Sequence, residues 1–435
     1  MKTYRHPKKA EWEEIVRRPR LDNSQLRETV SHVLADVCER GDAAVLDYEE
    51  RFDHVRPLSL AVSEDEMAEA ERLVSPELRD AIVLAHENIR NFHSAQFFRP
   101  VRTETRSGVV CTQRSIPIER VGLYIPGGTA PLFSTVLMLA TPAKFAGCGE
   151  IVICTPPTFK SDETTLDIHP AILVAARIAG VKHVYKAGGV QAIGAMAYGT
   201  ETIPKVFKIF GPGNQYVMAA KQQVSLEDVA IDMPAGPSEV CVVADETANP
   251  QFVAADLLSQ AEHGPDSQVL LITTSEELLA QVETELVRQL EQLPRKTIAT
   301  KALENSRFVL VGNKDEAMSL SNLYAPEHLI LQTDDWLTLA PKVVNAGSVF
   351  LGHYACESAG DYASGTNHTL PTHGYATAYS GVNLDSFCRK VTFQHLSERG
   401  VREIGRAVEL MAEAEQLYAH KNAMTVRLRY IDENN

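Results

Sequence analysis

From Arg120 onward, short apolar runs alternate with stretches of helical pattern, and this alternation limits the possible folds more than any other feature of the chain. The runs RVGLYI and EIVICT enclose a helix-like stretch, and strand, helix and strand at this spacing form a parallel βαβ unit. The same order repeats to about residue 225 and again between about 239 and 352. The sequence therefore predicts an α/β protein with two open, Rossmann-like domains.

The predicted domain boundaries follow from where these patterns start and stop. Four parts are expected. They are an N-terminal helical segment at 1–21, a first α/β domain made of the two stretches 22–123 and 240–382, a second α/β domain at 124–239, and a C-terminal helical tail for dimerisation at 383–435. Within the first domain, about 29 residues after Gly352 show no regular period. Long irregular stretches in compact enzymes are usually functional or disordered, so we expect a functional loop there.

Composition excludes several classes of partner. The formal charge is −15 without a long basic tract, which argues against nucleic acid as a ligand. The strongest apolar run, around 136–140, is far shorter than the roughly 20 residues that cross a bilayer. No apolar core follows the basic N-terminal residues, so no signal peptide is expected. The seven cysteines form no CxxC pair, which favours a reducing compartment, and we expect the cytoplasm.

Several residues could carry chemistry, although none belongs to a familiar zinc or nucleotide signature. Glycine-rich turns near Gly127, Gly188 and Gly211 each follow a predicted strand and precede a helix, where open α/β sheets bind ligands. Gln260 and His263 are spaced i and i+3 at the end of a predicted helix, so both can face one point and form half of a metal site. For the glycine turns, tight turns that need Gly are the commoner explanation.

Glu327 and His328 precede an apolar strand as neighbours. Neighbours on extended chain face opposite sides, so they are expected to serve two different points or two steps rather than form one hydrogen-bonded pair. A solvated Glu and a hydrogen-bonded structural His at a strand entrance are the commoner explanation. Taken singly, Asp361 and His420 are structural residues more often than not.

At the level of long motifs, the chain resembles the L-histidinol dehydrogenase family. The run 231-IDMPAGPSEVCVVADETANPQFVAADLLSQAEHGPDSQ-268 is similar to that family's signature, and RVGLYIPGGTAPLFSTVLML, GGVQAIGAMAYG, IFGPGN, YAPEHLI, ESAGDYASGTNHTLPT and AHKNA match as well. The similarity spans nearly the whole chain. It implies a zinc enzyme that oxidises L-histidinol to L-histidine through the aldehyde, in two hydride transfers that consume two NAD+.

The resemblance also implies roles for individual residues. It makes Gln260, His263, Asp361 and His420 the ligands of one Zn2+ per subunit, an N/O-rich set that also suits manganese or cobalt. Glu327 and His328 match the family's two general bases. The implied substrate contacts are Ser238, Gln260, His263, His328, Asp361, Glu415 and His420, and the implied NAD contacts are Tyr124, Gln191 and Asn214.

For partners, the resemblance implies a homodimer whose tail reaches into the partner subunit's site, with no nucleic acid and no membrane involved. About seven extra residues near 160–168 depart from the family pattern and are expected to form a surface loop.

Three alternatives remain open on the sequence. Paired open α/β units also occur in aldehyde dehydrogenases, which use a catalytic cysteine; Cys154 and Cys241 lie in apolar strand patterns, where a buried, inert thiol is the default. A non-oxidative zinc hydrolase could use the same ligands with an activated water. A zinc-stabilised binding protein without chemistry is the third.

Overall fold

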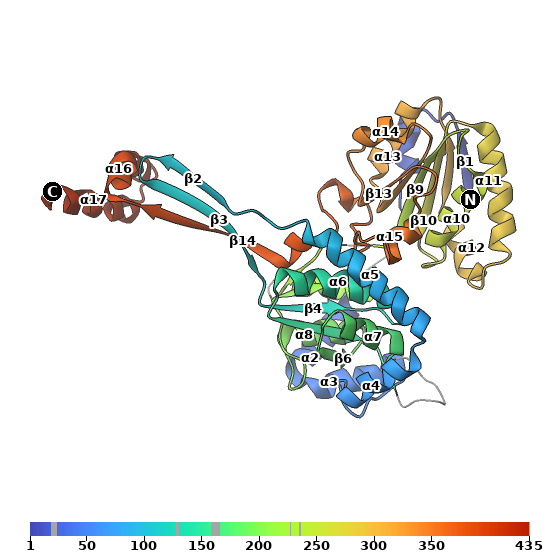
Figure 1. Ribbon diagram of the computed structural model, residues 1–435, viewed down its shortest axis with the longest axis horizontal. Coiled ribbons are helices and arrows are strands. Elements are labelled where there is room, and N and C mark those ends of the chain that lie inside the picture. Colours follow the sequence, from blue (N-terminus) through green and yellow to red (C-terminus); the bar gives the residue numbers. More distant parts are fainter. Residues whose placement is uncertain (19–23, 128–129, 158–165, 227, 235, 435) are drawn as a thin grey trace.

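The computed structural model describes residues 1–435 except 19–23, 128–129, 158–165, 227, 235 and 435, so most of the expected loop at 160–168 lies outside the described residues. Two α/β units lie side by side, and an extended arm projects from one of them (Figure 1). The N-terminus lies in the unit away from the arm, and the C-terminus lies at the arm's tip. The predicted α/β class is confirmed.

The first unit is built on a five-stranded parallel sheet in the order β6-β5-β4-β7-β8. Its strands are β4 (Arg120–Tyr124), β5 (Glu150–Thr155), β6 (His183–Lys186), β7 (Lys208–Phe210) and β8 (Ala230–Ile231). The chain adds β5 and β6 on one side of β4 and then returns to add β7 and β8 on the other. The carboxyl ends of β4 and β7 therefore form a switch point, where open α/β sheets bind ligands.

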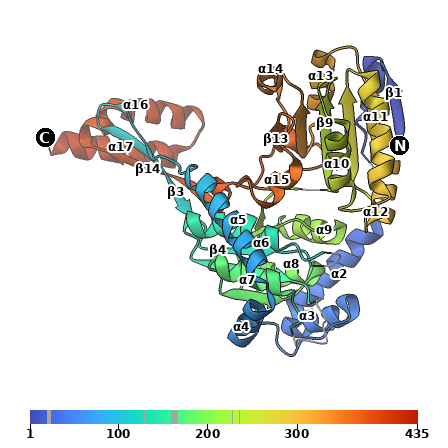
Figure 2. The same cartoon turned by 45° about the vertical axis from the view of Figure 1, so that its right-hand side comes forward.

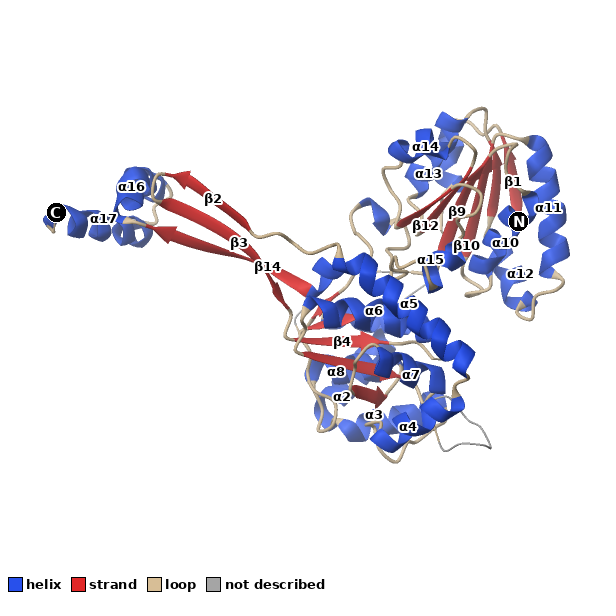
Figure 3. Ribbon diagram, viewed as in Figure 1, coloured by secondary structure: helices blue, strands red, loops and turns tan. Residues whose placement is uncertain are grey.

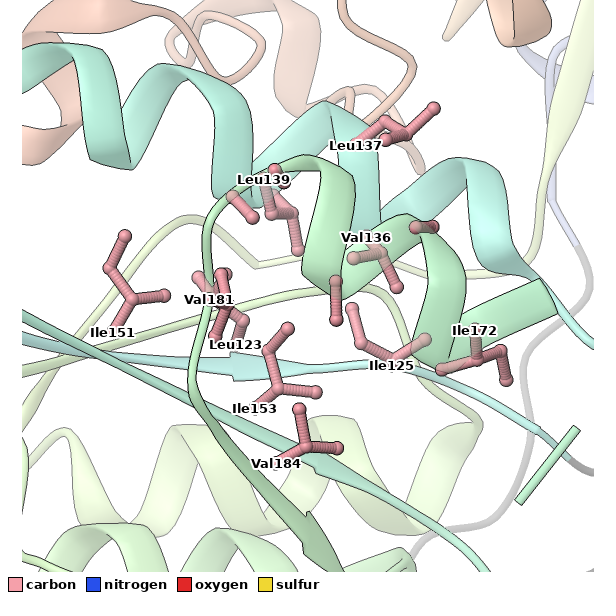
Figure 4. Close-up of a cluster of buried hydrophobic side chains, with 14 of the residues drawn as sticks. Leu123, Ile125, Val136, Leu137, Leu139, Ile151, Ile153, Ile172, Val181 and Val184 are labelled. Carbon is pink, nitrogen blue, oxygen red and sulfur yellow. The ribbon is translucent and has the colours of Figure 1, made fainter. Parts of the chain in front are cut away.

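Helices cover both faces of this sheet in two layers. The inner helices are α6 (Phe133–Ala146) and α7 (Pro170–Ile178) on one face, and α8 (Gly189–Tyr198) and α9 (Gln215–Val224) on the other. Figure 4 shows the apolar contact between Leu123, Ile153 and Val184 of the strands and the helix side chains above them. These side chains are almost fully buried, and their burial supplies the main stabilising free energy of this unit.

The outer layer consists of helices that precede the sheet in sequence: α2 (Ser24–Arg40), α3 (Asp42–Tyr48), α4 (Glu64–Leu73) and α5 (Pro76–Ser94). Helix α2 packs on α8 and α9, α4 packs on α7, and α5 packs on α6. The predicted division, which placed residues 22–123 with residues 240–382, differs from this packing. These helices contribute no strand of their own, and their apolar faces are buried against the five-stranded unit.

The second unit is a six-stranded parallel sheet in the order β1-β11-β10-β9-β12-β13. Its strands are β1 (Lys2–Arg5), β9 (Glu239–Ala244), β10 (Gln268–Thr273), β11 (Arg307–Leu310), β12 (His328–Gln332) and β13 (Ser348–Leu351). Its main helices are α10 (Pro250–Ala261), α11 (Glu276–Leu290), α12 (Lys296–Glu304) and α13 (Lys314–Tyr324), with shorter α1 (Trp12–Ile15) and α14 (Trp336–Leu339). The N-terminal segment, predicted as helical throughout, begins instead with β1.

The sequence missed β1 because its four residues, Lys-Thr-Tyr-Arg, include no aliphatic side chain and none of them is buried. Its backbone pairs in parallel with β11, from Lys2 opposite Arg307 to Arg5 opposite Leu310. This long-range pairing overrides the local pattern.

The arm is a three-stranded antiparallel sheet capped by two helices (Figure 3). It contains β2 (Val101–Arg106), β3 (Val109–Pro117) and β14 (Cys388–Leu396), followed by α16 (Glu398–Ala414) and α17 (Tyr418–Glu433). The tail predicted as helical at 383–435 therefore contains a strand: a 3-10 helical turn at Leu384–Phe387 leads into β14, which pairs with β3 along its whole length. Among the described residues, no helix is long and apolar enough to cross a membrane.

The two units meet at particular edges of their sheets. Tyr124 ends β4, so the five-stranded sheet contributes its carboxyl edge, whereas His328 begins β12, so the six-stranded sheet contributes its amino edge. Hydrogen bonds cross the junction: Asn88 Nδ2 donates to the Ala363 carbonyl at 2.9 Å, and Asn367 Nδ2 donates to the Met138 carbonyl at 2.5 Å. Thr135 Oγ1, in the first turn of α6, lies 3.1 Å from His368 Nε2, and His368 Nδ1 lies 3.0 Å from the carbonyl oxygen of Asp361. The helix that follows β4 therefore begins next to a predicted metal ligand.

Candidate metal and active site

Helix α10 delivers the first two predicted ligands. Asn249 caps its first turn through its side chain, Pro250 occupies its first position, and the helix ends at Ala261. Gln260 is fully buried and His263 lies just beyond the helix. The Gln260 amide lies among Glu327, Glu357 and the backbone N–H of Glu239; in the orientation that satisfies both of its atoms, it donates to Glu357 and accepts from Glu239 N at 2.7 Å. Gln260 therefore contacts the carboxylates at this end of α10.

A short helix, α15 (Glu357–Tyr362), brings two carboxylates to the same place. Glu357 and Asp361 are four residues apart and so share one face of the helix. One ligand atom from each of His263, Glu357 and Asp361 lies within 4.8 Å of the others. The stretch after Gly352 was predicted to have no regular period, and α15 corrects that expectation. Glu357 was not among the predicted site residues, although the spacing of Glu and Asp in ESAGD was the signal that could have found it.

Glu327 and His328 lie in the same cluster and are both buried. Glu327 Oε2 accepts a hydrogen bond from Glu239 N at 3.0 Å and lies 3.7 Å from His328 Nδ1. His328 Nε2 lies 3.4 Å from Asp361 Oδ1. Strand β12 begins only at His328, so strand alternation does not govern Glu327, and both side chains enter one cluster. The expectation that they form no hydrogen-bonded pair agrees with the 3.7 Å separation.

The electrostatics of this cluster favour a cation. Burial raises the pKa of Glu327 to about 8 and raises that of Glu357 well above its usual range. Burial lowers the pKa of His328, but Glu357, Glu327 and Asp361 together outweigh it and raise that pKa to about 10. Both ring nitrogens of His328 are buried and make no hydrogen bond. Three crowded carboxyl groups, with the ring of His263 beside Glu357 and Asp361, form a donor set that fits a divalent metal ion.

His420 and Glu415 are not brought to this cluster by their own chain. Glu415 caps the end of α16, His420 lies on α17, and both are exposed. Figures 1 and 2 both place these helices at the end of the arm, far from α10 and α15. Within one chain, three of the four predicted ligands therefore converge, and the fourth does not.

Ser238, a predicted substrate contact, directly precedes β9 and Glu239. It lines a small cavity of about 10 Å³ together with Arg18 and Gln268, which is room for about one water molecule. Arg18 is bound in this cavity wall by Glu239, with Nη2 at 2.8 Å from Oε1. Because the Glu239 backbone N–H contacts Glu327, Ser238 lies beside the cluster.

The three predicted NAD contacts lie at the carboxyl edge of the five-stranded sheet. The Tyr124 hydroxyl accepts from Gly189 N at 3.2 Å, and Gln191 Nε2 donates to Glu49 Oε1 at 2.8 Å. Asn214 Oδ1 caps α9 by accepting from Tyr216 N and Val217 N. Their positions fit an edge that takes a dinucleotide, and the buried Gln191 Oε1 has no partner.

The loop before Asn214 lies so close to Tyr124 that one of its positions needs glycine. Gly211 has a φ of 123°, and a Cβ there would lie 2.1 Å from the Tyr124 carbonyl oxygen. Lys221 Nζ donates to the Gly211 carbonyl at 2.7 Å and pairs with Asp232 at 2.5 Å, and both side chains are almost fully buried. Asp232 Oδ2 in turn accepts from Gly211 N at 2.8 Å. This clamp fixes the loop between β7 and α9.

The cysteine alternative finds no support in the geometry. Cys154 and Cys241 are fully buried in the centres of β5 and β9. Burial raises the pKa of both thiols, that of Cys241 to about 12, so neither is a thiolate at neutral pH.

Comparison with known proteins identifies the family to which the chain belongs. A family model described as Histidinol dehydrogenase matches residues 16–428. A histidinol dehydrogenase from Bacteroides thetaiotaomicron is 62% identical over 428 residues, which are 98% of this chain and 99% of that protein. One from Vibrio parahaemolyticus is 50% identical over 423 residues, 97% of this chain and 96% of that protein. The crystal structure of histidinol dehydrogenase from Elizabethkingia anophelis matches with a TM-score of 0.95 at 54% identity, covering 99% of both chains.

Proposed function

Since this chain belongs to the histidinol dehydrogenase family, we propose that it oxidises L-histidinol to L-histidine with NAD+ as the acceptor, in histidine biosynthesis. The match of family and chain over nearly their whole length carries the proposal. The cluster of His263, Glu357 and Asp361 supports a metal centre next to a cofactor edge, as such an enzyme needs.

We propose zinc as the metal, held by Gln260, His263 and Asp361 of one subunit and by His420 of the partner subunit. When bound, the ion would orient the substrate's imidazole and amine groups and offset the charge of the surrounding carboxylates. Glu357, which shares the cluster, accepts from Gln260 and so orients that ligand. The exposed position of His420 on the arm, away from its own chain's cluster, supports a site completed by a second subunit.

The roles of the two bases rest on the family match. A bound cation would lower the pKa of both Glu327 and His328, which would free them to accept protons. When bound, NAD+ accepts the hydride of each oxidation. His328 accepts the hydroxyl proton in the first oxidation, which leaves an aldehyde. Glu327 then removes a proton from water as it adds to the aldehyde carbon, and His328 accepts a proton from the resulting gem-diol in the second oxidation. Tyr124, Gln191 and Asn214 would hold the dinucleotide, and Ser238 and the partner's Glu415 would contact the substrate.

The arm supports a homodimer. Its helices expose large apolar side chains that its own chain leaves uncovered: Leu410, Met411, Leu417, Tyr418, Val426 and Tyr430. Exposed apolar patches of this kind mark protein interfaces. The seven cysteines are all unpaired, which supports the cytoplasm as the proposed location.

The proposal is tested by removing and restoring the metal. The protein is dialysed against a chelator, zinc is added back, and NADH and histidinol are measured in the same reaction. Two NADH per histidinol consumed, lost with the metal and restored with zinc, are expected. Consumption of substrate without NADH would favour a hydrolase, and loss of stability without any turnover would favour a zinc-stabilised binding protein.

A further inference from the structure

A buried acidic pair lies behind the predicted cofactor edge. Glu49 and Asp53 are the first and last residues of a single π-helical turn that follows α3. Such turns are rare and frequently occur at functional sites. Glu49 is completely buried, whereas Asp53 is partly exposed. Nothing in the proposed reaction uses this pair.

Glu49 accepts hydrogen bonds from groups at the start of α8 that could otherwise donate to a phosphate. Its Oε1 accepts from Gly188 N at 2.7 Å and from Gln191 Nε2 at 2.8 Å. The next backbone N–H, that of Gly189, donates to the Tyr124 hydroxyl. The start of α8 is thus filled by the protein's own acceptors, and this part of the edge is not a phosphate site.

Two buried oxygen atoms in this group have no hydrogen-bond partner: Glu49 Oε2 and Gln191 Oε1. Gln191 is fully buried, and its Oε1 would lie 2.9 Å from a Cβ built on Gly189, so the amide points at that turn. Burial raises the pKa of Glu49 to about 8 and raises the pKa of Asp53 as well. Because Glu49 is the more buried of the two, it holds the proton of the pair, and the single negative charge lies on the partly exposed Asp53.

Asp53 lies where the strands β5 and β6 end. A Cβ built on Gly188, just after β6, would lie 3.3 Å from Asp53 Oδ2 and 2.5 Å from Cβ of Pro156, just after β5. In dinucleotide-binding sheets, the acidic group that accepts from the adenosine ribose hydroxyls lies near the end of the strand next to the switch point. Strand β5 is that neighbour of β4 here, and the described residues that follow it directly, Pro156 and Pro157, supply no acid.

The basic side chains near Asp53 interact with other groups. Lys186, the last residue of β6, pairs with Glu66 at 2.6 Å and with Asp167 at 3.1 Å. The Arg51 guanidinium lies over the Phe52 ring, 5.3 Å from its centre. His54 follows Asp53 and lowers its pKa, but only as the lesser effect. The local charge therefore suits a hydroxyl donor and disfavours a phosphate dianion.

We propose that Asp53, oriented by Glu49, makes this chain select NAD+ over its 2′-phosphorylated form. This inference rests on the proposed function, because it assumes that the edge binds a dinucleotide. Asp53 would accept a hydrogen bond from a ribose hydroxyl and would repel a phosphate at the same position.

The test measures binding rather than turnover. Dissociation constants of NAD+ and NADP+ are measured by calorimetry, without histidinol, for the metal-loaded protein and its variants. For Asp53→Asn, the preference for NAD+ over NADP+ should fall about tenfold or more, because a like-charge repulsion is removed. For Glu49→Gln the preference should be kept, because a glutamine amide can still accept from Gly188 N and donate to Asp53.

The matched control is Glu50→Gln, which removes the same charge from the exposed side of the same turn, where Glu50 pairs with Arg56. It should leave both constants unchanged. Asp53→Ser serves as a second variant if Asp53→Asn does not fold, as judged by its melting temperature. An unchanged preference in folded Asp53 variants that still bind NAD+ overturns the inference. Failure of the unmodified protein to bind either dinucleotide instead overturns the proposed function.

Discussion

At the scale of single residues, Glu327 and His328 are two buried titratable groups beside the proposed metal ligands. Asp361 raises the pKa of both. We expect Glu327→Gln and His328→Gln each to lower kcat by about 10² to 10⁴, the usual contribution of a general base.

The two variants should differ in which oxidation they impair, and the measurement is NADH formed per histidinol in a single turnover. Glu327→Gln should stop near one NADH, because water addition to the aldehyde fails, whereas His328→Gln should slow both oxidations. The control is Glu277→Gln on the exposed side of α11, which should behave as the unmodified protein. Equal and full yields of NADH from both variants would contradict the assigned roles.

Asp256 gives a pH-dependent stability that is separate from catalysis. Burial raises its pKa to about 7, although Gln332 donates to it at 2.5 Å and opposes the rise. The folded protein therefore binds this proton more tightly than the unfolded chain. The stability from this group is present below about pH 4 and is lost as the pH rises to about 7, a change on the order of a few kcal/mol.

We expect Asp256→Asn, which stays neutral, to lose less stability between pH 4 and pH 7 than the unmodified protein does. Melting temperatures across this pH range measure the effect. Asp80→Asn, at an exposed position, is the control. Parallel pH curves for Asp256→Asn and the unmodified protein would show that Asp256 is ionised in the fold.

Single site residues were predictable only where they lie in long motifs. Gln260, His263 and Asp361 were predicted and converge, and the individual roles stay predictions. Glu357 was missed because a lone glutamate in an irregular, glycine-rich stretch looks solvated, and its burial depends on contacts with distant residues such as Gln260.

At the scale of elements, the loop between β7 and α9 depends on one buried ion pair. Lys221→Met would leave Asp232 buried without its cation, which destabilises proteins by about 3–5 kcal/mol. Urea unfolding measures the loss, and Lys182→Met, at an exposed position, is the control. A change of less than about 1 kcal/mol, the range of an exposed ion pair, would show that the pair does not hold the loop.

The alternation of apolar runs and helical stretches predicted most strands and helices after Arg120, because parallel sheets bury both faces and leave continuous apolar runs. It failed for β1, whose four residues are held by pairing with β11 rather than by their own pattern. The sequence pattern also did not predict which sheet helices α2 to α5 pack against. An amphipathic pattern shows which face of a helix is buried, but it does not show which sheet covers that face.

At the scale of the whole molecule, the arm carries two proposed site residues away from their own chain's cluster. We expect His263→Asn and His420→Asn each to be inactive alone and active when mixed and allowed to exchange subunits. About a quarter of full turnover should return, because half of the dimers formed by random exchange are mixed and each mixed dimer has one intact site.

Two variants on the same side of the site, His263→Asn and Asp361→Asn, provide the control and should not complement one another. Recovery in that control, or none in the first mixture despite mixed dimers shown by mass spectrometry, would contradict a site shared between subunits.

The central claim is that one divalent ion lies at the junction of the two units and is completed by the partner's arm. Anomalous X-ray diffraction at the zinc absorption edge, from crystals of the zinc-loaded protein, tests it most directly. We expect one strong anomalous peak per subunit, surrounded by Gln260, His263 and Asp361 and by His420 of the partner subunit. A peak elsewhere, or none among these four side chains, would contradict it.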